Sequence, residues 1–405
     1  MGAGIAMKLD NIWLDEAAVA NDATLQSLCN QRTDSADYPL AAEIVSQIPV
    51  YLGASVRDAA AHSQTAPDKV RRFQEEWARC LNQGAGVVVV RNGIDDIALL
   101  DQVTEVFNTI IQTERESGSG ADHFAPAGSN TRIWNAHEKL CIQAPELFAA
   151  YCANETMALM CHAWLGPGYQ ITAQANIVHP GGRAQDCHRD YHMGFQRVDE
   201  LLHYPAHVHS MSPLLTLQGG IAHSDMPLES GPTKLLPFSQ QFLPGYLATE
   251  RQSCIDFFEA HCVQVALQKG DFLFFNPALM HAAGDNHTTD VQRFANLLQV
   301  GSVYGRAMEY LDRARMSVAV YPVLQRLHEQ NANKGNTWSD RQTQLVIAAC
   351  AEAYPFPANM ELEPPTDGLA PLSQQQLMRQ CLSEQCTTEQ FAKRIAAMQA
   401  LKRSH

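Results

Sequence analysis

The sequence lacks the features that mark several large classes of protein. No apolar run approaches the roughly 18 residues that a membrane span needs. The N-terminus has neither the charged-then-apolar pattern of a secretory signal nor the Ser or Thr of a myristoylation motif. The 11 cysteines are an odd number without a C-x-x-C pair or dense spacing, which argues against a disulfide scaffold. These absences predict a cytoplasmic protein.

Basic residues are also scarce. The chain has 29 Lys and Arg against 43 Asp and Glu, a net charge of -14. Such an acidic surface repels phosphate backbones and anionic lipid heads. We therefore expect no nucleic acid and no membrane among the partners, and instead a small-molecule substrate. No heptad repeat or apolar stripe stands out from which an oligomeric state would follow.

The 405 residues contain enough apolar material for a large core, with 46% hydrophobic and 18% charged side chains. Apolar residues recur at three- and four-residue steps from Val70 to Leu81, which predicts a helix, and the run Val87 to Val90 predicts a buried strand. From Tyr169 to about Tyr304, Gly and Pro separate short apolar runs, a pattern typical of a sandwich or barrel.

We expect one α+β unit over residues 1–405. Residues 1–85 should form an N-terminal helical extension, residues 86–304 a β core with supporting helices, and residues 305–405 a C-terminal helical region. The last region should end in a helix, because Thr387 to Gln390 has the form of a capping box.

The segment that carries the clearest chemistry is His188-x-Asp190. In an extended strand, residues two apart point to the same face, so both side chains can contact one ion. The best candidate for a third ligand is His281, which follows the apolar run DFLFF and a turn at Pro277. Two His and one carboxylate leave adjacent positions open on a metal, as in non-haem Fe(II) oxygenases. Because the set lacks thiolate, a structural zinc site is less favoured.

A fourth residue, Arg293, follows His281 by 12 positions. This interval allows a turn and a returning strand that brings the guanidinium to the same pocket. A guanidinium inside an acidic protein needs an anion, and its planar fork suits a carboxylate. The distal carboxylate of 2-oxoglutarate is such an anion.

At this point a family resemblance is plain. The sequence resembles the phytanoyl-CoA dioxygenase family of Fe(II)/2-oxoglutarate-dependent oxygenases in HRDYH at 188–192, ESGPTKLLPFSQ at 229–240, GDFLFFNPALMHAAGDN at 270–286 and WLGPGYQIT at 164–172. The resemblance implies a double-stranded β-helix, a jelly-roll or cupin-like core, flanked by N- and C-terminal helices. It also implies that His188, Asp190 and His281 bind iron and that Arg293 binds 2-oxoglutarate.

Two departures from the family pattern concern the cosubstrate. Family members usually place the Arg 11 residues after the distal His, so the longer interval here implies an insertion. Many members also carry Ser or Thr two residues after that His, where this chain has Ala283. Other donors for the cosubstrate are therefore sought, and the candidates are Gln174, Asn176, Arg132 and Lys139.

Three further residues are candidates for the substrate pocket. His192 lies four residues after His188, and in an extended segment it would face the substrate or support a ligand. Trp134 and Phe195 are candidates as pocket walls, although a role in the core is the favoured interpretation of each. Asp186 is a possible alternative to Asp190, but its order relative to His188 does not match the family.

The expected function is an Fe(II)/2-oxoglutarate-dependent dioxygenase that uses O2 to hydroxylate an unactivated C–H bond of a small metabolite. Succinate and CO2 would be the co-products. Halogenases of this type lack the carboxylate ligand, so Asp190 favours hydroxylation or a related oxidation. Two alternatives remain: a barrel that binds metal or ligand without turnover, and a hydroxylase of protein side chains.

Overall fold

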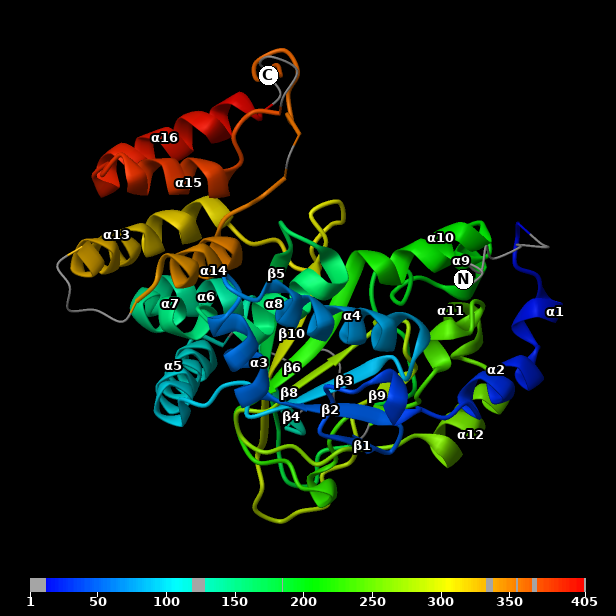
Figure 1. Cartoon of the computed structure of the whole chain (residues 1–405). Helices are drawn as coiled ribbons and strands as arrows, with labels where there is room; N and C mark the ends of the chain where they lie inside the picture. The colour runs from blue at the N-terminus through cyan, green and yellow to red at the C-terminus, as the bar shows by residue number, and fades with distance from the viewer. Residues whose placement is uncertain are drawn as a thin grey trace.

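An eight-stranded sheet lies at the centre of the computed structural model, which describes residues 12–118, 128–183, 185–332, 338–354, 356–365 and 370–403 (Figure 1). Its strand order is β1-β2-β3-β8-β6-β10-β5-β4, and every neighbouring pair is antiparallel except β2 with β3. The strands of this sheet are β1 (Glu43–Val45), β2 (Ile48–Leu52), β3 (Val87–Arg91), β4 (Asn130–Ile133), β5 (Gln170–Val178), β6 (Thr216–Ala222), β8 (Phe272–Phe275) and β10 (Arg293–Gly301).

A smaller sheet faces the first. It pairs β7 (Lys234–Leu235) with β9 (His281–Ala282), and isolated bridges add His188 beside His281 and Val263 beside Leu235. The two sheets together form the expected double-stranded β-helix. The segment after Cys262 forms no strand of its own and contributes only the isolated bridges of Val263 with Leu235 and of Leu267 with Met226.

Both faces of the large sheet are buried, and the strand sequences show why. In β3, Val88 and Val90 face one apolar cluster, whereas Val87 and Val89 face another. In β8, Phe272 and Phe274 belong to the first cluster, whereas Leu273 and Phe275 belong to the second. Continuous apolar runs therefore replace the alternation of polar and apolar residues seen in half-exposed strands.

Helices cover the outer face of the large sheet (Figure 1). The helix α4 begins at Pro67, which is tolerated in a first turn, and ends before Gly84, as its sequence predicts. At the other end of the chain, Thr387 and Gln390 form the predicted capping box at the start of helix α16. The helices around the sheet are α3 (Gly53–Ala61), α4 (Pro67–Gln83), α5 (Ile97–Glu116), α6 (Ala136–Gln143), α7 (Pro145–Cys152) and α8 (Glu155–Leu165).

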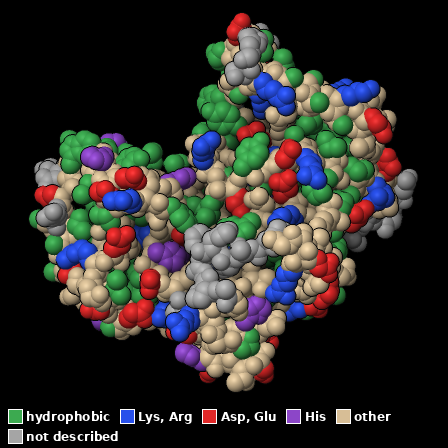
Figure 2. All heavy atoms as spheres, turned by 180° about the vertical axis from the view of Figure 1, so that it is seen from behind, with side chains coloured by type: hydrophobic (Ala, Val, Ile, Leu, Met, Phe, Trp, Pro, Cys, Tyr) green, Lys and Arg blue, Asp and Glu red, His purple; other side chains and the backbone are tan. Residues whose placement is uncertain are grey.

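Outside these helices lies a C-terminal layer of α13 (Arg313–Ala332), α14 (Asp340–Cys350), α15 (Gln374–Ser383) and α16 (Thr388–Leu401). The remaining helices pack on the other side of the core, and they are α1 (Glu16–Val19), α2 (Asp22–Cys29), α9 (Val198–Leu201), α10 (Ala206–Met211), α11 (Gly245–Ala248) and α12 (Gln252–His261). Seen from behind, the molecule is notched between these two groups of helices, and acidic and basic side chains are interspersed over that face (Figure 2).

The N-terminal region differs from the helical extension expected for residues 1–85. It contributes β1 and β2 to the large sheet, with β2 beside β3. The run Ile48 to Tyr51 is buried on both faces, so it has no alternation that would identify it as a strand. Among the described residues, no helix combines the length and the apolar character needed to cross a membrane.

A buried hydrogen-bond chain ties α5 and α7 to the sheet. Asn296 Nδ2 donates to the Tyr151 hydroxyl (3.0 Å), which lies 3.1 Å from His223 Nε2. The other ring nitrogen of His223 is 2.8 Å from Thr104 Oγ1, whose proton goes to the Leu100 carbonyl. Because the threonine proton is already used, Nδ1 of His223 must donate and Nε2 must accept from Tyr151. The chain is satisfied only with a neutral imidazole.

This network predicts a pH-dependent loss of stability. Burial, assisted by Lys269, lowers the pKa of His223 to about 3. Below the ordinary pKa of about 6.5, the imidazole is protonated in the unfolded chain but stays neutral in the folded chain. The free energy of unfolding therefore decreases by about 1.4 kcal/mol for each unit by which the pH is lowered. The variant His223→Gln should show a shallower fall in the free energy of unfolding between pH 6.5 and 4, measured by urea denaturation. An unchanged slope would contradict this assignment.

Candidate metal centre and its cavity

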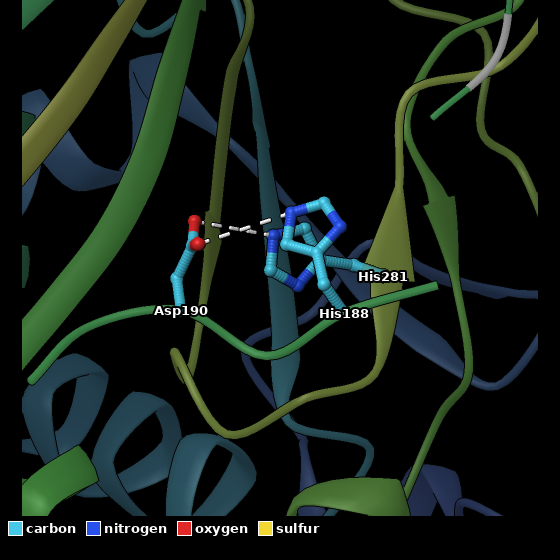
Figure 3. Close-up of side chains that lie close together, drawn as sticks. All are labelled: His188, Asp190 and His281. Atoms are coloured by element: carbon cyan, nitrogen blue, oxygen red, sulfur yellow. Dashed lines mark ion pairs between the residues drawn. The ribbon is translucent and has the colours of Figure 1, made fainter. Parts of the chain in front are cut away.

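Three side chains that are distant in sequence converge at the open edge of the smaller sheet. His188, Asp190 and His281 each offer one ligand atom, and these atoms all lie within 4.8 Å of one another. Asp190 Oδ1 is 3.8 Å from His188 Nε2, and Oδ2 is 3.5 Å from His281 Nε2. Figure 3 shows both imidazoles directed toward the carboxylate.

The backbone fixes the positions of the three residues. His188 and His281 exchange two hydrogen bonds, N to O, of 3.0 and 3.1 Å across the isolated bridge. The Asp190 amide donates to the Pro277 carbonyl (3.0 Å), and the Tyr246 hydroxyl donates to the Asp190 carbonyl (2.9 Å). The segment is extended only as far as Asp190, because the next residue, Tyr191, has a φ of 68°.

Each histidine is oriented by a second hydrogen bond. Nδ1 of His188 lies 2.8 Å from the Asp186 carbonyl, and Nδ1 of His281 lies 2.9 Å from the Leu279 carbonyl. A carbonyl only accepts, so both Nδ1 atoms carry the proton and both Nε2 atoms present a lone pair to the centre. Two such nitrogens and a carboxylate fit a ferrous ion, and this set contains no thiolate.

Asp190 is held as a carboxylate. Burial alone would raise its pKa, but the interactions with His281, His188 and Gln218 outweigh burial and lower the pKa to about 2. Gln218 Nε2 donates directly to Oδ2 of Asp190. Burial also lowers the pKa of His188, and the neighbouring His281 lowers it further. The site therefore favours the deprotonated forms that bind metal ions.

A cavity of about 490 Å³ opens beside the three residues. Its walls come from β4, β5, β6, β8 and β10 and from the segments around His188 and Ala283. The predicted cosubstrate candidates that line it are Arg293, Gln174, Asn176 and Arg132. Lys139 does not line it and forms an ion pair with Glu114 instead.

The three candidates for the substrate pocket are placed differently. Phe195 lines the cavity with 56% of its surface exposed. Trp134 is not part of the wall, and Arg132 lies over its ring at 5.3 Å from the centroid. His192 is exposed and also off the wall, with Nε2 3.3 Å from Thr216 Oγ1, because its φ of 42° turns the chain away from the extended path.

Arg293 begins β10, opposite Val178, despite the longer interval after His281. The extra residue lies in a loop that Asn286 closes, since Nδ2 of Asn286 donates to the carbonyls of Val178, His179 and Val291. Arg293 is only 7% exposed, and burial lowers its pKa to about 10, so it still carries a charge at neutral pH. Among the described residues, no carboxylate forms an ion pair with it.

Three supporting residues were not identified from the sequence. Gln218 and Tyr246 orient Asp190 through its side chain and its carbonyl. Thr233, the residue before β7, lines the cavity. Only Thr233 lies in a motif that the sequence singled out, ESGPTKLLPFSQ.

A search of curated proteins gave no match. Among solved structures, the crystal structure of the non-heme alpha ketoglutarate dependent epimerase SnoN from nogalamycin biosynthesis has a TM-score of 0.41 and 15% identity, covering 58% of this chain and 84% of that chain. The carbocyclase SnoK from the same biosynthesis has a TM-score of 0.40 and 17% identity, covering 58% of this chain and 86% of that chain. At these TM-scores the likeness carries no further conclusion.

The family comparison is more extensive. The model of the phytanoyl-CoA dioxygenase (PhyH) family matches residues 82–295, just over half of the chain. This range contains β3, β4, β5, β6 and β8 of the large sheet and the start of β10, together with the three converging side chains and Arg293. The protein therefore belongs to the phytanoyl-CoA dioxygenase family of oxygenases, which use Fe(II), 2-oxoglutarate and O2.

Proposed function

We propose that the protein hydroxylates a C–H bond of a small polar organic molecule, with His188, Asp190 and His281 as the iron ligands. The observation that carries this proposal is the convergence of two lone-pair nitrogens and an ionised carboxylate beside a cavity of about 490 Å³. The bound iron, 2-oxoglutarate and O2 supply the oxidation, in which one oxygen atom enters the substrate and the other enters succinate as CO2 leaves.

Arg293 is the residue that we propose for the distal carboxylate of 2-oxoglutarate. Its charge is buried in the cavity wall without an acidic partner among the described residues. Arg132, the other cationic candidate, donates through Nη1 to Gln174 Oε1 (2.7 Å), and Gln174 also bonds Glu309. Because Glu309 offsets the charge of Arg132, the uncompensated cation in the cavity is Arg293.

A row of amide side chains supports a polar substrate. Gln299 lies opposite Gln218 across β10 and β6, and Gln174 Nε2 donates to Gln299 Oε1 (3.4 Å). Gln218 must direct its nitrogen toward Asp190, because a carboxylate only accepts. Its Oε1 is then left buried without a partner in the described structure. A substrate hydroxyl or amine near the reacting carbon would satisfy such an acceptor.

We further propose that the chain acts as one catalytic unit rather than as a core with dispensable extensions. The N-terminal region adds β1 and β2 beside β3. The C-terminal region places Met308 in the cavity wall, and Glu309 accepts a hydrogen bond from the Asn135 amide (2.9 Å). Deleting either region should therefore disturb the cavity.

The test is the release of succinate from 2-oxoglutarate with Fe(II) and O2, screened against hydroxylated compounds, amino-acid derivatives and long-chain acyl-CoA. We expect slow succinate release alone, with polar compounds raising the rate and yielding products one oxygen atom heavier. Stimulation by acyl-CoA alone would refute the polar substrate class. Metal and 2-oxoglutarate binding without any succinate would instead identify a binding protein.

A further inference from the structure

The family pattern leaves one partner of the cosubstrate unassigned in this chain. Ala283 stands where many members carry a hydroxyl, and a methyl group cannot donate to a carboxylate. Arg293 lies in the same cavity wall with a buried charge. A carboxylate beside it would have oxygens that the guanidinium alone does not satisfy, so a second donor is expected nearby.

The strand register places a hydroxyl directly across from Ala283. In the pair β7 and β9, Leu235 lies opposite His281 and Lys234 lies opposite Ala282. Continuing this antiparallel ladder by one residue brings Thr233 opposite Ala283. Directly opposed residues point to the same face of a sheet, and both of these residues line the cavity.

The two segments are pressed together at this point. A Cβ on Gly231, whose φ is 68°, would lie 2.1 Å from the Asp285 carbonyl oxygen, so only glycine permits the approach. Arg293 Nη1 then donates to one carbonyl from each segment, Ser230 at 2.9 Å and Gly284 at 3.3 Å. The same contact that orients Arg293 therefore also sets the position of Thr233.

We propose that the Thr233 hydroxyl donates to the distal carboxylate of 2-oxoglutarate and replaces, from the neighbouring strand, the hydroxyl missing at Ala283. Thr233 is half-buried, and its hydroxyl makes no hydrogen bond to another described residue, which leaves it available to a ligand. This inference rests on the proposed function, because it assigns a partner to the cosubstrate of that reaction.

The experiment measures 2-oxoglutarate binding by anaerobic calorimetry with Fe(II) present. Thr233→Val keeps the shape of the side chain and removes the donor, and it should weaken binding about tenfold, the loss of one hydrogen bond to a charged group. Thr233→Ser should bind like the wild type. The double variant Thr233→Val with Ala283→Ser moves the hydroxyl across the ladder and should recover most of the affinity.

Two controls separate the possible failures. Thr109→Val, on the exposed part of α5, should leave binding unchanged. If the wild type binds 2-oxoglutarate and Thr233→Val binds equally well, the assignment of Thr233 is wrong while the proposed function stands. If Thr233→Val weakens binding but the double variant does not recover it, the hydroxyl is not the cause and the assignment also fails. If the wild type itself does not bind, the proposed function fails with it.

Discussion

Replacing Asp190 with alanine should abolish the release of succinate from 2-oxoglutarate. Asp190 is the only carboxylate among the three converging residues, and its lowered pKa keeps it ionised at neutral pH. Without it, two neutral imidazoles must hold a divalent cation alone. Because the loss of residues that merely support a ligand costs about 10- to 100-fold, the loss of the ligand itself should lower turnover by more than about 100-fold.

The measurement is succinate formed per enzyme under saturating Fe(II), 2-oxoglutarate and O2. Asp199→Ala is a matched control, because Asp199 is an exposed carboxylate on α9 whose partner is Arg197. The control should retain wild-type turnover, and circular dichroism should show that both variants are folded. If Asp190→Ala released succinate near the wild-type rate, Asp190 would not be a ligand of the metal.

The second large effect concerns Arg293. Arg293→Leu should raise the dissociation constant of 2-oxoglutarate at least about 30-fold, since removing one partner of a buried charge pair costs about 2–5 kcal/mol. The same variant should leave the stability of the protein without cosubstrate unchanged or higher. The reason is that the wild-type guanidinium is buried without an acidic partner among the described residues, which is unfavourable in itself.

This opposite behaviour of binding and stability distinguishes a cosubstrate anchor from a structural arginine. Binding is measured by anaerobic calorimetry and stability by urea denaturation. Arg132→Leu is the comparison, because Arg132 already donates to Gln174 and has the nearby carboxylate of Glu309 to offset its charge. Removing Arg132 should therefore destabilise the protein and weaken the binding of 2-oxoglutarate less than Arg293→Leu does. If Arg293→Leu lost stability and kept its affinity, Arg293 would be a structural residue.

The residues of the candidate site differ in how well their sequence context predicts them. His188 and Asp190 share a face because two residues of extended chain bring them together, and the apolar run before Pro277 indicates where His281 turns inward. Their convergence follows the prediction, and their role in binding iron stays a prediction. Gln218 and Tyr246 carry no such signal, because a Gln in a strand and a Tyr in a short helix are compatible with many roles.

The errors have physical causes as well. His192 and Trp134 were candidates for the pocket, but neither lines the cavity: the backbone at His192 is left-handed, and Arg132 lies over the ring of Trp134. The strand β2 was missed because a run buried on both faces has no period to detect. Thr233 was missed because the donor depends on a pairing between strands, and the register of that pairing is visible only in the folded chain.

The most direct test of the central claim is an anaerobic titration of the protein with Fe(II) and 2-oxoglutarate, followed by visible spectroscopy. If His188, Asp190 and His281 bind one ferrous ion with room for the oxoacid, a weak charge-transfer band should appear and saturate at one equivalent of iron. The band should be lost in Asp190→Ala. Absence of the band in the wild type at saturating iron and 2-oxoglutarate would contradict the assignment.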